Sequence, residues 1–393
     1  KEIMPVTAKT KTEIKIMVDL PSFAGRAAKT RIKKVGLTRI EGIIAESGKH
    51  PYYFLEKGKI KDYENIIFRG IKGIADFFEE VWVRTSDIRS DEFKNLEGAP
   101  KDVEANPMLG MHGIRYGLKN PEILRAELKA LKRVADNGKK IGVMMPQIIS
   151  VDELKEVKKI LDEINFNKAK VGIMIETPAA VQMIKEFCLE GMNFISFGTN
   201  DLTQYMLAVD RGNRSVQHLY NEMHPAVLYQ LAYVIRVCKR NHVETSICGQ
   251  AGSKKEMVKF LVENGIDSIS VNADAANEIS LYVAEIEKEM IKGTDEEPRK
   301  YQPEKENKEE YFPKIRGAKN MKKEDYSKMA DLGEVNEDRI EEDIKAIEEE
   351  KREYIEKEGD DAELNEENEE EAKPEETRHG DAEPGKDEVL DIF

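Results

Sequence analysis

The chain has 393 residues, enough for one large domain with an appendage or for two to three ordinary domains. Its formal net charge of −15 argues against nonspecific nucleic-acid binding, and no apolar run approaches the roughly 20 residues that cross a bilayer. Three cysteines, Cys188, Cys238 and Cys248, show neither metal-ligand nor disulfide-framework spacing, which favours a reducing compartment. We therefore expect a cytoplasmic protein with no membrane and no nucleic-acid partner.

Short apolar runs rich in β-branched residues recur through the first two-thirds of the chain. Eight can be counted, at 14–20, 34–40, 81–87, 141–147, 171–177, 194–200, 244–250 and 268–274. Most of them are continuously apolar rather than alternating, which is typical of strands buried on both faces of a parallel sheet.

Helical patterns separate several of these runs. Residues 122–137 carry an apolar stripe with helical spacing, and residues 254–264 end before a glycine. Residues 151–164 follow Ser150, which with Glu153 forms a capping-box pattern. Eight strands with intervening helices predict an α/β fold, a (β/α)8 TIM barrel. An open doubly wound sheet is the alternative, because a strand count alone does not prove closure.

The composition changes after Gly293. Residues 294–393 are dominated by Glu, Lys, Asp and Pro, which predicts an acidic, largely disordered C-terminal tail with a possible helix at 334–357. We therefore expect two parts, a barrel over 1–293 and a low-complexity tail over 294–393. Since Lys1 rather than a methionine opens the sequence, we also expect a processed or partial product.

Polar or reactive side chains stand at the ends of five of the eight runs. They are Arg39, Arg84, Glu176, Asn200, Asp201 and Cys248. The carboxyl ends of the strands form the active-site face of a (β/α)8 barrel. One such residue is more often part of a structural ion pair. Five polar strand ends together favour a site, because each would otherwise bury a polar group.

The residue types in this set suit one another chemically. Glu176 and Asp201 supply oxygen ligands for one Mg2+, and arginines supply forked donors for phosphate or carboxylate. Asn200 is placed to donate to a substrate carboxylate. Cys248 is a candidate proton carrier, with a thiol pKa that neighbouring cations would lower toward neutrality. The set predicts a site for a small phosphorylated or carboxylated molecule that passes through an enolate.

Six segments around these residues follow one another in a recognisable order. They are GLTRIE at 36–41, VRTSD at 83–87, NPMLG at 106–110, GIMIETP at 172–178, FGTNDLTQ at 197–204 and CGQAGS at 248–253. Over roughly the first 290 residues the chain thereby resembles the phosphoenolpyruvate-utilising enzyme family. One departure is visible, because His112 stands where the family pattern leads us to expect an anion-binding arginine.

The resemblance implies a division of labour among seven residues. The substrate-binding residues would be Arg39, Arg84, Glu176, Asn200, Asp201 and Arg211. Among them, the three arginines would hold the transferring phosphoryl group. Glu176 and Asp201 would also ligate Mg2+, and the catalytic Cys248 would exchange a proton with C3 of pyruvate enolate. The enolate would then take a phosphoryl group from a phosphohistidine to form phosphoenolpyruvate.

Three members of the family fit these segments: the phosphoenolpyruvate synthases, the pyruvate phosphate dikinases and enzyme I of the sugar phosphotransferase system. The dikinase and enzyme I usually carry an acid where Gln250 stands, so this position resembles a synthase, and residues 47–51 resemble an archaeal insert. Residues 200–213 are close to enzyme I as well. A noncatalytic regulatory fragment is a further alternative.

The sequence shows neither a glycine-rich nucleotide loop nor a phosphocarrier histidine. We therefore expect the phosphohistidine domain to come from a missing N-terminal half or from a separate chain. The other expected partners are pyruvate, phosphoenolpyruvate and further copies of this chain in a homo-oligomer.

Overall fold

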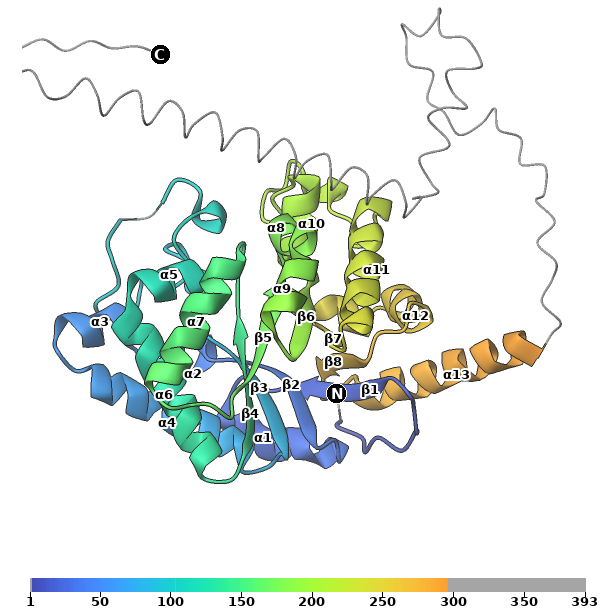
Figure 1. The fold of residues 1–393 in the computed structure, drawn as a ribbon, viewed down its shortest axis with the longest axis horizontal. Coiled ribbons are helices and arrows are strands. Elements are labelled where there is room, and N and C mark those ends of the chain that lie inside the picture. The colour runs from blue at the N-terminus through green and yellow to red at the C-terminus, as the bar shows by residue number, and fades with distance from the viewer. Residues whose placement is uncertain (1, 103, 296–393) are drawn as a thin grey trace, which may run out of the picture. The chain divides into compact units, whose positions relative to one another are not determined.

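A computed structural model of the chain describes residues 2–102 and 104–295. Within them, eight parallel strands pair in chain order and close into a barrel (Figure 1). The closing pair is β1 (Glu13–Met17) with β8 (Ser268–Asn272), which are in register along their whole length. This confirms the predicted (β/α)8 barrel and excludes the open sheet.

The remaining strands follow the predicted runs closely. They are β2 (Lys34–Arg39), β3 (Glu80–Arg84), β4 (Lys140–Met145), β5 (Lys170–Ile175), β6 (Phe194–Gly198) and β7 (Glu244–Cys248). Each predicted run extended past the C-terminal end of its strand. The reason is that pairing stops where the chain turns into the loops of the carboxyl face, whereas the sequence pattern continues into those loops.

Helices surround the strands (Figure 1). Their bounds are α1 (Pro21–Ala27), α2 (Glu41–Glu46), α3 (Pro51–Glu56), α4 (Ile60–Ala75), α5 (Gly113–Lys119), α6 (Pro121–Asp136), α7 (Val151–Glu163), α8 (Pro178–Gln182), α9 (Ile184–Glu190), α10 (Thr199–Leu207), α11 (Pro225–Arg240), α12 (Lys255–Glu263) and α13 (Ala276–Asp295). Short 3-10 turns lie at Ala28–Thr30, Pro107–Leu109, Gln217–Leu219 and Gln250–Ser253. None of the described helices is both long enough and apolar enough to span a bilayer.

The three predicted helices correspond to α6, α7 and α12, each within one residue at either end. The capping box is present, because Ser150 Oγ accepts from the Glu153 backbone and the Glu153 carboxylate accepts from the Ser150 backbone. The last helix, α13, reaches Asp295, two residues past the predicted boundary at 293. The predicted tail and its possible helix at 334–357 lie outside the described residues.

The barrel interior is filled by large apolar side chains that meet across it. Trp82 of β3 stacks on Phe194 of β6 with ring centroids 4.2 Å apart. Gly142 on β4 makes room for the indole, because a Cβ there would come within 2.2 Å of Trp82. Trp82 is thus a packing residue, and the interior is a core rather than a channel.

Ion pairs close the opposite end of the barrel, where the strands begin. Lys15 is fully buried, and its Nζ lies 2.5 Å from Glu244 Oε1. Lys170 pairs similarly with Glu80 at 3.1 Å. Charges at this amino-terminal face serve stability, which leaves the carboxyl face for function.

Two of the three cysteines and three of the six histidines occupy structural or surface positions. Cys188 in α9 and Cys238 in α11 are buried in the core. His224 caps α11 by accepting from the Ala226 backbone at 3.1 Å. His218 and His242 are exposed. These residues carry no part of the site described next.

Candidate active site

A cavity of about 570 Å3 opens at the carboxyl ends of the strands. It is lined by all seven predicted site residues, Arg39, Arg84, Glu176, Asn200, Asp201, Arg211 and Cys248. Arg39, Arg84 and Cys248 are the last residues of β2, β3 and β7. Asn200 and Asp201 lie in the first turn of α10 rather than at a strand end, but the closed barrel still directs them to the same cavity.

Arg84 is a buried cation held between two carboxylates. Its Nη2 donates to Glu41 Oε1 at 2.8 Å, and its Nη1 lies 3.9 Å from Asp87 Oδ2. Glu41 also accepts from the Asp87 backbone N–H at 2.6 Å, so the two acids brace each other. The buried Nε of Arg84 has no acceptor among the described residues. A buried donor without an acceptor is costly, so an anion that came within reach of this N–H would be stabilised by it.

Two further arginines reach the cavity from more exposed positions. Arg39 is held by Asp19, which accepts from the Arg39 backbone N–H at 2.8 Å and from its Nε at 2.9 Å. Arg211 lies with Nη2 3.3 Å from Asp201 Oδ1. About half of the Arg39 side chain and two-fifths of the Arg211 side chain are exposed. The three guanidinium groups offer forked donors suited to a phosphoryl group.

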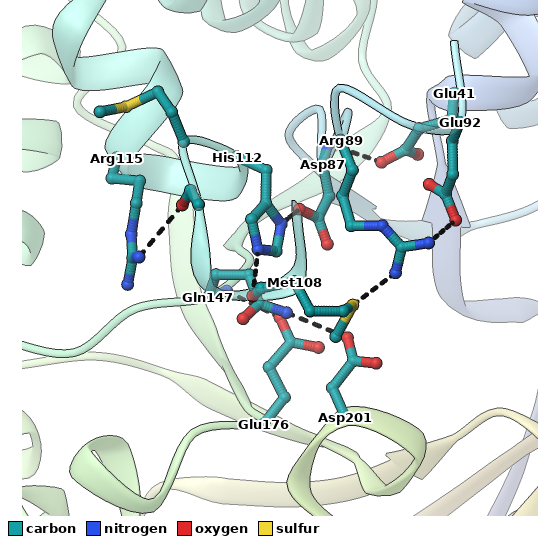
Figure 2. Close-up of polar contacts among 12 residues, drawn as sticks. Glu41, Asp87, Arg89, Glu92, Met108, His112, Arg115, Gln147, Glu176 and Asp201 are labelled. Carbon is teal, nitrogen blue, oxygen red and sulfur yellow. Dashed lines mark hydrogen bonds and ion pairs between the residues drawn. The ribbon is translucent and has the colours of Figure 1, made fainter. Parts of the chain in front are cut away.

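The carboxylates of Glu176 and Asp201 lie near each other, and both residues line the cavity (Figure 2). Glu176 directly follows β5 and is buried, and its Oε1 accepts from the Gln147 backbone N–H at 2.7 Å. Asp201 Oδ2 accepts from Gln147 Nε2 at 3.0 Å. Gly198 leaves space for the other Glu176 oxygen, because a Cβ there would come within 2.5 Å of Oε2.

The electrostatics of this carboxylate pair fit a divalent cation. Burial raises the pKa of Glu176, and the charge of Asp201 raises it further. Burial also raises the pKa of Asp201, against the opposite effect of Arg211. Asp201 Oδ1 accepts no hydrogen bond from the described residues. A cation that prefers oxygen ligands, such as Mg2+, would stabilise the ionised form of both carboxylates.

The protein would supply few of the ligands of such a metal site. In the described ranges, no group of three or more His, Cys, Asp or Glu side chains is arranged to hold a metal. Two carboxylates would therefore be the acidic ligands, with substrate oxygens and water completing the shell. Mg2+ is commonly bound in this way, through one or two carboxylates and a substrate phosphate.

Asn200 connects the arginine side of the cavity to a buried acid. When its amide is placed so that both atoms are satisfied, the nitrogen donates to Glu222 Oε1 and the oxygen accepts from Arg211 Nη1, each at 3.2 Å. Glu222 is itself buried and ion-paired with Lys254. The second amide hydrogen of Asn200 is left for a substrate oxygen.

Cys248 is buried at the end of β7, and its thiol donates to the Phe197 carbonyl at 3.4 Å. Burial raises the pKa of this thiol to about 11, although Arg84 and Arg39 act in the opposite direction. The expected shift toward neutrality is therefore wrong for this structure, because the loss of hydration outweighs the two cations. Near neutral pH the group is a thiol that can donate a proton.

His112 does not take the place of an anion-binding arginine. It is buried, with Nδ1 2.6 Å from Asp87 Oδ1 and Nε2 2.9 Å from the Met108 carbonyl (Figure 2). Since both partners are acceptors, both ring nitrogens carry protons, and neither N–H remains for a ligand. The ring instead links Asp87 to Met108 within the connection between β3 and α5.

Several functional contacts were missed from the sequence. Glu41 and Asp87 brace Arg84, and both stand inside the quoted segments at 36–41 and 83–87, so a local signal for them existed. Gln147 is the last residue of the predicted run 141–147, a position like that of Glu176 in the run 171–177. It was not selected as a site residue because a neutral amide does not by itself indicate catalysis or metal binding. Tyr205 of α10 gave no signal, and its hydroxyl lies 2.7 Å from the Met108 carbonyl.

Comparison with known proteins agrees with this geometry. The model of the family described as PEP-utilising enzyme, PEP-binding domain, matches residues 1–288. The probable phosphoenolpyruvate synthase of Archaeoglobus fulgidus is 44% identical over 302 residues, covering 74% of this chain and 40% of that protein. The phosphoenolpyruvate synthase of Pyrococcus furiosus is 46% identical over 288 residues, covering 72% and 35%.

A phosphoenolpyruvate-protein phosphotransferase of Buchnera aphidicola is 36% identical over 259 residues, covering 63% of this chain and 43% of that protein. The chain thus spans less than half the length of each of these three curated relatives. Because the family model covers far more than half of the chain and the strand-end residues meet in one cavity, the chain belongs to the PEP-utilising enzyme family, of which it carries the PEP-binding domain.

Proposed function

We propose that the barrel transfers a phosphoryl group between a phosphohistidine and the enolate of pyruvate, as the C-terminal part of a phosphoenolpyruvate synthase. The observation that carries the proposal is a single cavity that joins three arginines, a crowded carboxylate pair and one buried thiol. The complete reaction would convert ATP, pyruvate and water to AMP, phosphoenolpyruvate and phosphate, in the gluconeogenic direction. The identity to two archaeal proteins with this name supports the choice.

In the proposed reaction, the thiolate of Cys248 takes a proton from the methyl group of pyruvate. The C–H electron pair forms the C2=C3 double bond, and the carbonyl electrons move to the oxygen. This oxygen attacks the phosphorus of the phosphohistidine, and the P–N bond breaks with its electrons returning to the imidazole. In the reverse direction the Cys248 thiol protonates C3, the step for which its raised pKa prepares it.

The cations and the amide would hold the reactants in line. The free Nε–H of buried Arg84 would donate to a phosphoryl oxygen, and the more exposed Arg39 and Arg211 would enclose the same group. Asn200 would donate to the pyruvate carboxylate. Mg2+ held by Glu176 and Asp201 would offset the negative charge that develops on the substrate oxygens.

The phosphohistidine would come from a domain outside the described barrel, on the same protein or on a separate chain. We place the reaction in the cytoplasm and expect a homo-oligomer. Both are carried over from the resemblance and from the composition rather than from the cavity.

Specific observations disfavour two alternatives. Residues 200–213 are close to enzyme I, but Gln250 stands where enzyme I and the dikinase usually carry an acid, and the phosphotransferase relative is less similar than the two synthases. A noncatalytic fragment would have no reason to keep an unpaired Arg84 donor beside two crowded carboxylates.

Calorimetric titration with phosphoenolpyruvate tests the proposal, with Mg2+ present and in EDTA. We expect binding that depends on Mg2+ and weakens at least about tenfold, roughly 1.4 kcal/mol, in Glu176→Gln. Glu186→Gln is the matched control, because Glu186 is exposed on α9 and lies outside the cavity lining. Equal affinity in EDTA, or unchanged affinity in Glu176→Gln, would contradict the proposed site.

A further inference from the structure

Gln147 contacts both carboxylates of the candidate metal site without lining the cavity itself. It follows Pro146 just after β4 and is buried. Its backbone N–H donates to Glu176 Oε1 at 2.7 Å, and its side-chain Nε2 donates to Asp201 Oδ2 at 3.0 Å (Figure 2). Gln147 therefore donates a hydrogen bond to one carboxylate oxygen of Glu176 and to one of Asp201.

The backbone of Gln147 is in an unusual conformation. Its φ of 56° lies in the left-handed region, which is strained for a residue with a long side chain. Such strain persists only where the surroundings impose it, and it concentrates at functional sites. Gly113 at the start of α5 leaves room for Gln147 in this position, because a Cβ there would come within 2.7 Å of Gln147 Cβ. The strained conformation is the one in which main chain and side chain reach two different acids.

The side-chain amide is also engaged on its other atom. The hydroxyl of Tyr205 lies 3.0 Å from Gln147 Oε1 and 2.7 Å from the Met108 carbonyl, so it can donate to either. Tyr205 and Asp201 are one helical turn apart on α10. With Oε1 beside a hydroxyl group, Nε2 is directed at Asp201.

We propose that Gln147 is a positioning residue that fixes the Glu176 and Asp201 carboxylates for a divalent cation and thereby sets the metal affinity. The inference rests on the proposed function, because it concerns the same two acids. By bonding Oε1 of Glu176 and Oδ2 of Asp201, Gln147 leaves Oε2 of Glu176 for the metal, together with Oδ1 of Asp201, which Arg211 Nη2 approaches to 3.3 Å. A neutral amide achieves this without adding a positive charge, whereas a lysine or arginine in its place would repel the cation.

The test is divalent-cation binding by the full chain, followed with Mn2+ by electron paramagnetic resonance and with Mg2+ by calorimetry. Gln147→Leu removes the bond to Asp201 and keeps the backbone bond to Glu176. We expect Kd for both cations to rise about 10- to 100-fold, the usual effect of losing a group that orients a metal ligand. Gln217→Leu makes the same chemical change at an exposed residue outside the cavity lining and should leave Kd unchanged.

A second variant covers the case in which Gln147→Leu fails to fold. Asparagine tolerates the left-handed conformation better than glutamine, but it is one methylene too short to reach Asp201 from the same backbone. Gln147→Asn should therefore keep a Tm in EDTA close to that of wild type, because the relieved backbone strain offsets the lost hydrogen bond, while showing the same weaker metal binding. A role limited to structure would instead lower Tm in EDTA and leave Kd unchanged.

The outcomes separate this inference from the proposed function. If Asp201→Asn loses the cation while both Gln147 variants bind it like wild type, the inference is overturned and the metal site stands. If the wild-type chain binds neither cation, the metal site fails and the inference fails with it. Weaker binding in both Gln147 variants with the wild-type Tm in EDTA supports the positioning role.

Discussion

The buried thiol of Cys248 leads to a quantitative prediction about proton exchange at the methyl group of pyruvate. Burial raises the pKa of this thiol to about 11. Each pH unit below the pKa lowers the thiolate fraction tenfold, so at pH 7 only about one enzyme molecule in 10⁴ carries the base. If the thiolate removes the proton, the exchange rate should climb about tenfold per unit between roughly pH 7 and pH 10.

Exchange can be followed by NMR as the methyl signal of pyruvate disappears in D2O with Mg2+ and the protein. Cys248→Ser should abolish the exchange, because a hydroxyl is far less acidic than a thiol. Phosphoenolpyruvate affinity should stay within about tenfold, since Cys248 makes no ion pair in the cavity. Cys188→Ser is the matched control, because Cys188 lies in α9 away from the cavity lining.

Two results would refute this reasoning. Full exchange in Cys248→Ser would remove the thiol from the mechanism and leave another group as the proton carrier. A flat rate between pH 7 and pH 10, with activity lost in the serine variant, would keep Cys248 in the site but exclude a thiolate whose abundance limits the rate.

Two further predictions concern stability, measured by thermal or urea unfolding. Burial alone lowers the pKa of His112, but the hydrogen bond to Asp87 and its charge raise it overall. Because the pKa of His112 is raised on folding, the protonated ring stabilises the folded state by about 2 kcal/mol. This stabilisation is complete below the unfolded-state pKa of roughly 6.5 and is lost as pH rises through the folded-state pKa. The stability lost in His112→Gln should therefore be largest near about pH 6 and shrink above it; a loss independent of pH would contradict the ionised ring. Glu244→Gln should cost about 3 kcal/mol because it leaves fully buried Lys15 with a more distant carboxylate, Glu13 at 4.0 Å, whereas Lys15→Met should cost much less because Glu244 is 35% exposed; equal costs would argue against this asymmetry.

The barrel and most of the site residues could be predicted from the sequence because their signals are local. Continuously apolar runs mark strands buried on both faces, and Ser150 with Glu153 marks the start of α7 within a few residues. A polar residue that ends such a run has to face the open end of the barrel or be buried at a cost. That argument placed Arg39, Arg84 and Cys248 at the cavity without knowledge of any contact.

Only the tertiary structure decided how those residues act on one another. The pKa of Cys248 depends on how completely the barrel excludes water, and the sequence shows the nearby arginines but not the burial. The role of His112 depends on two acceptors, Asp87 and Met108, which the folding of the connection between β3 and α5 brings to opposite nitrogens of its ring. Gln147 reaches Glu176 and Asp201 only because strand order places three consecutive loops side by side at one face. Charge, hydration and hydrogen-bond partners depend on distances between residues far apart in the chain, and those distances are set when the barrel closes.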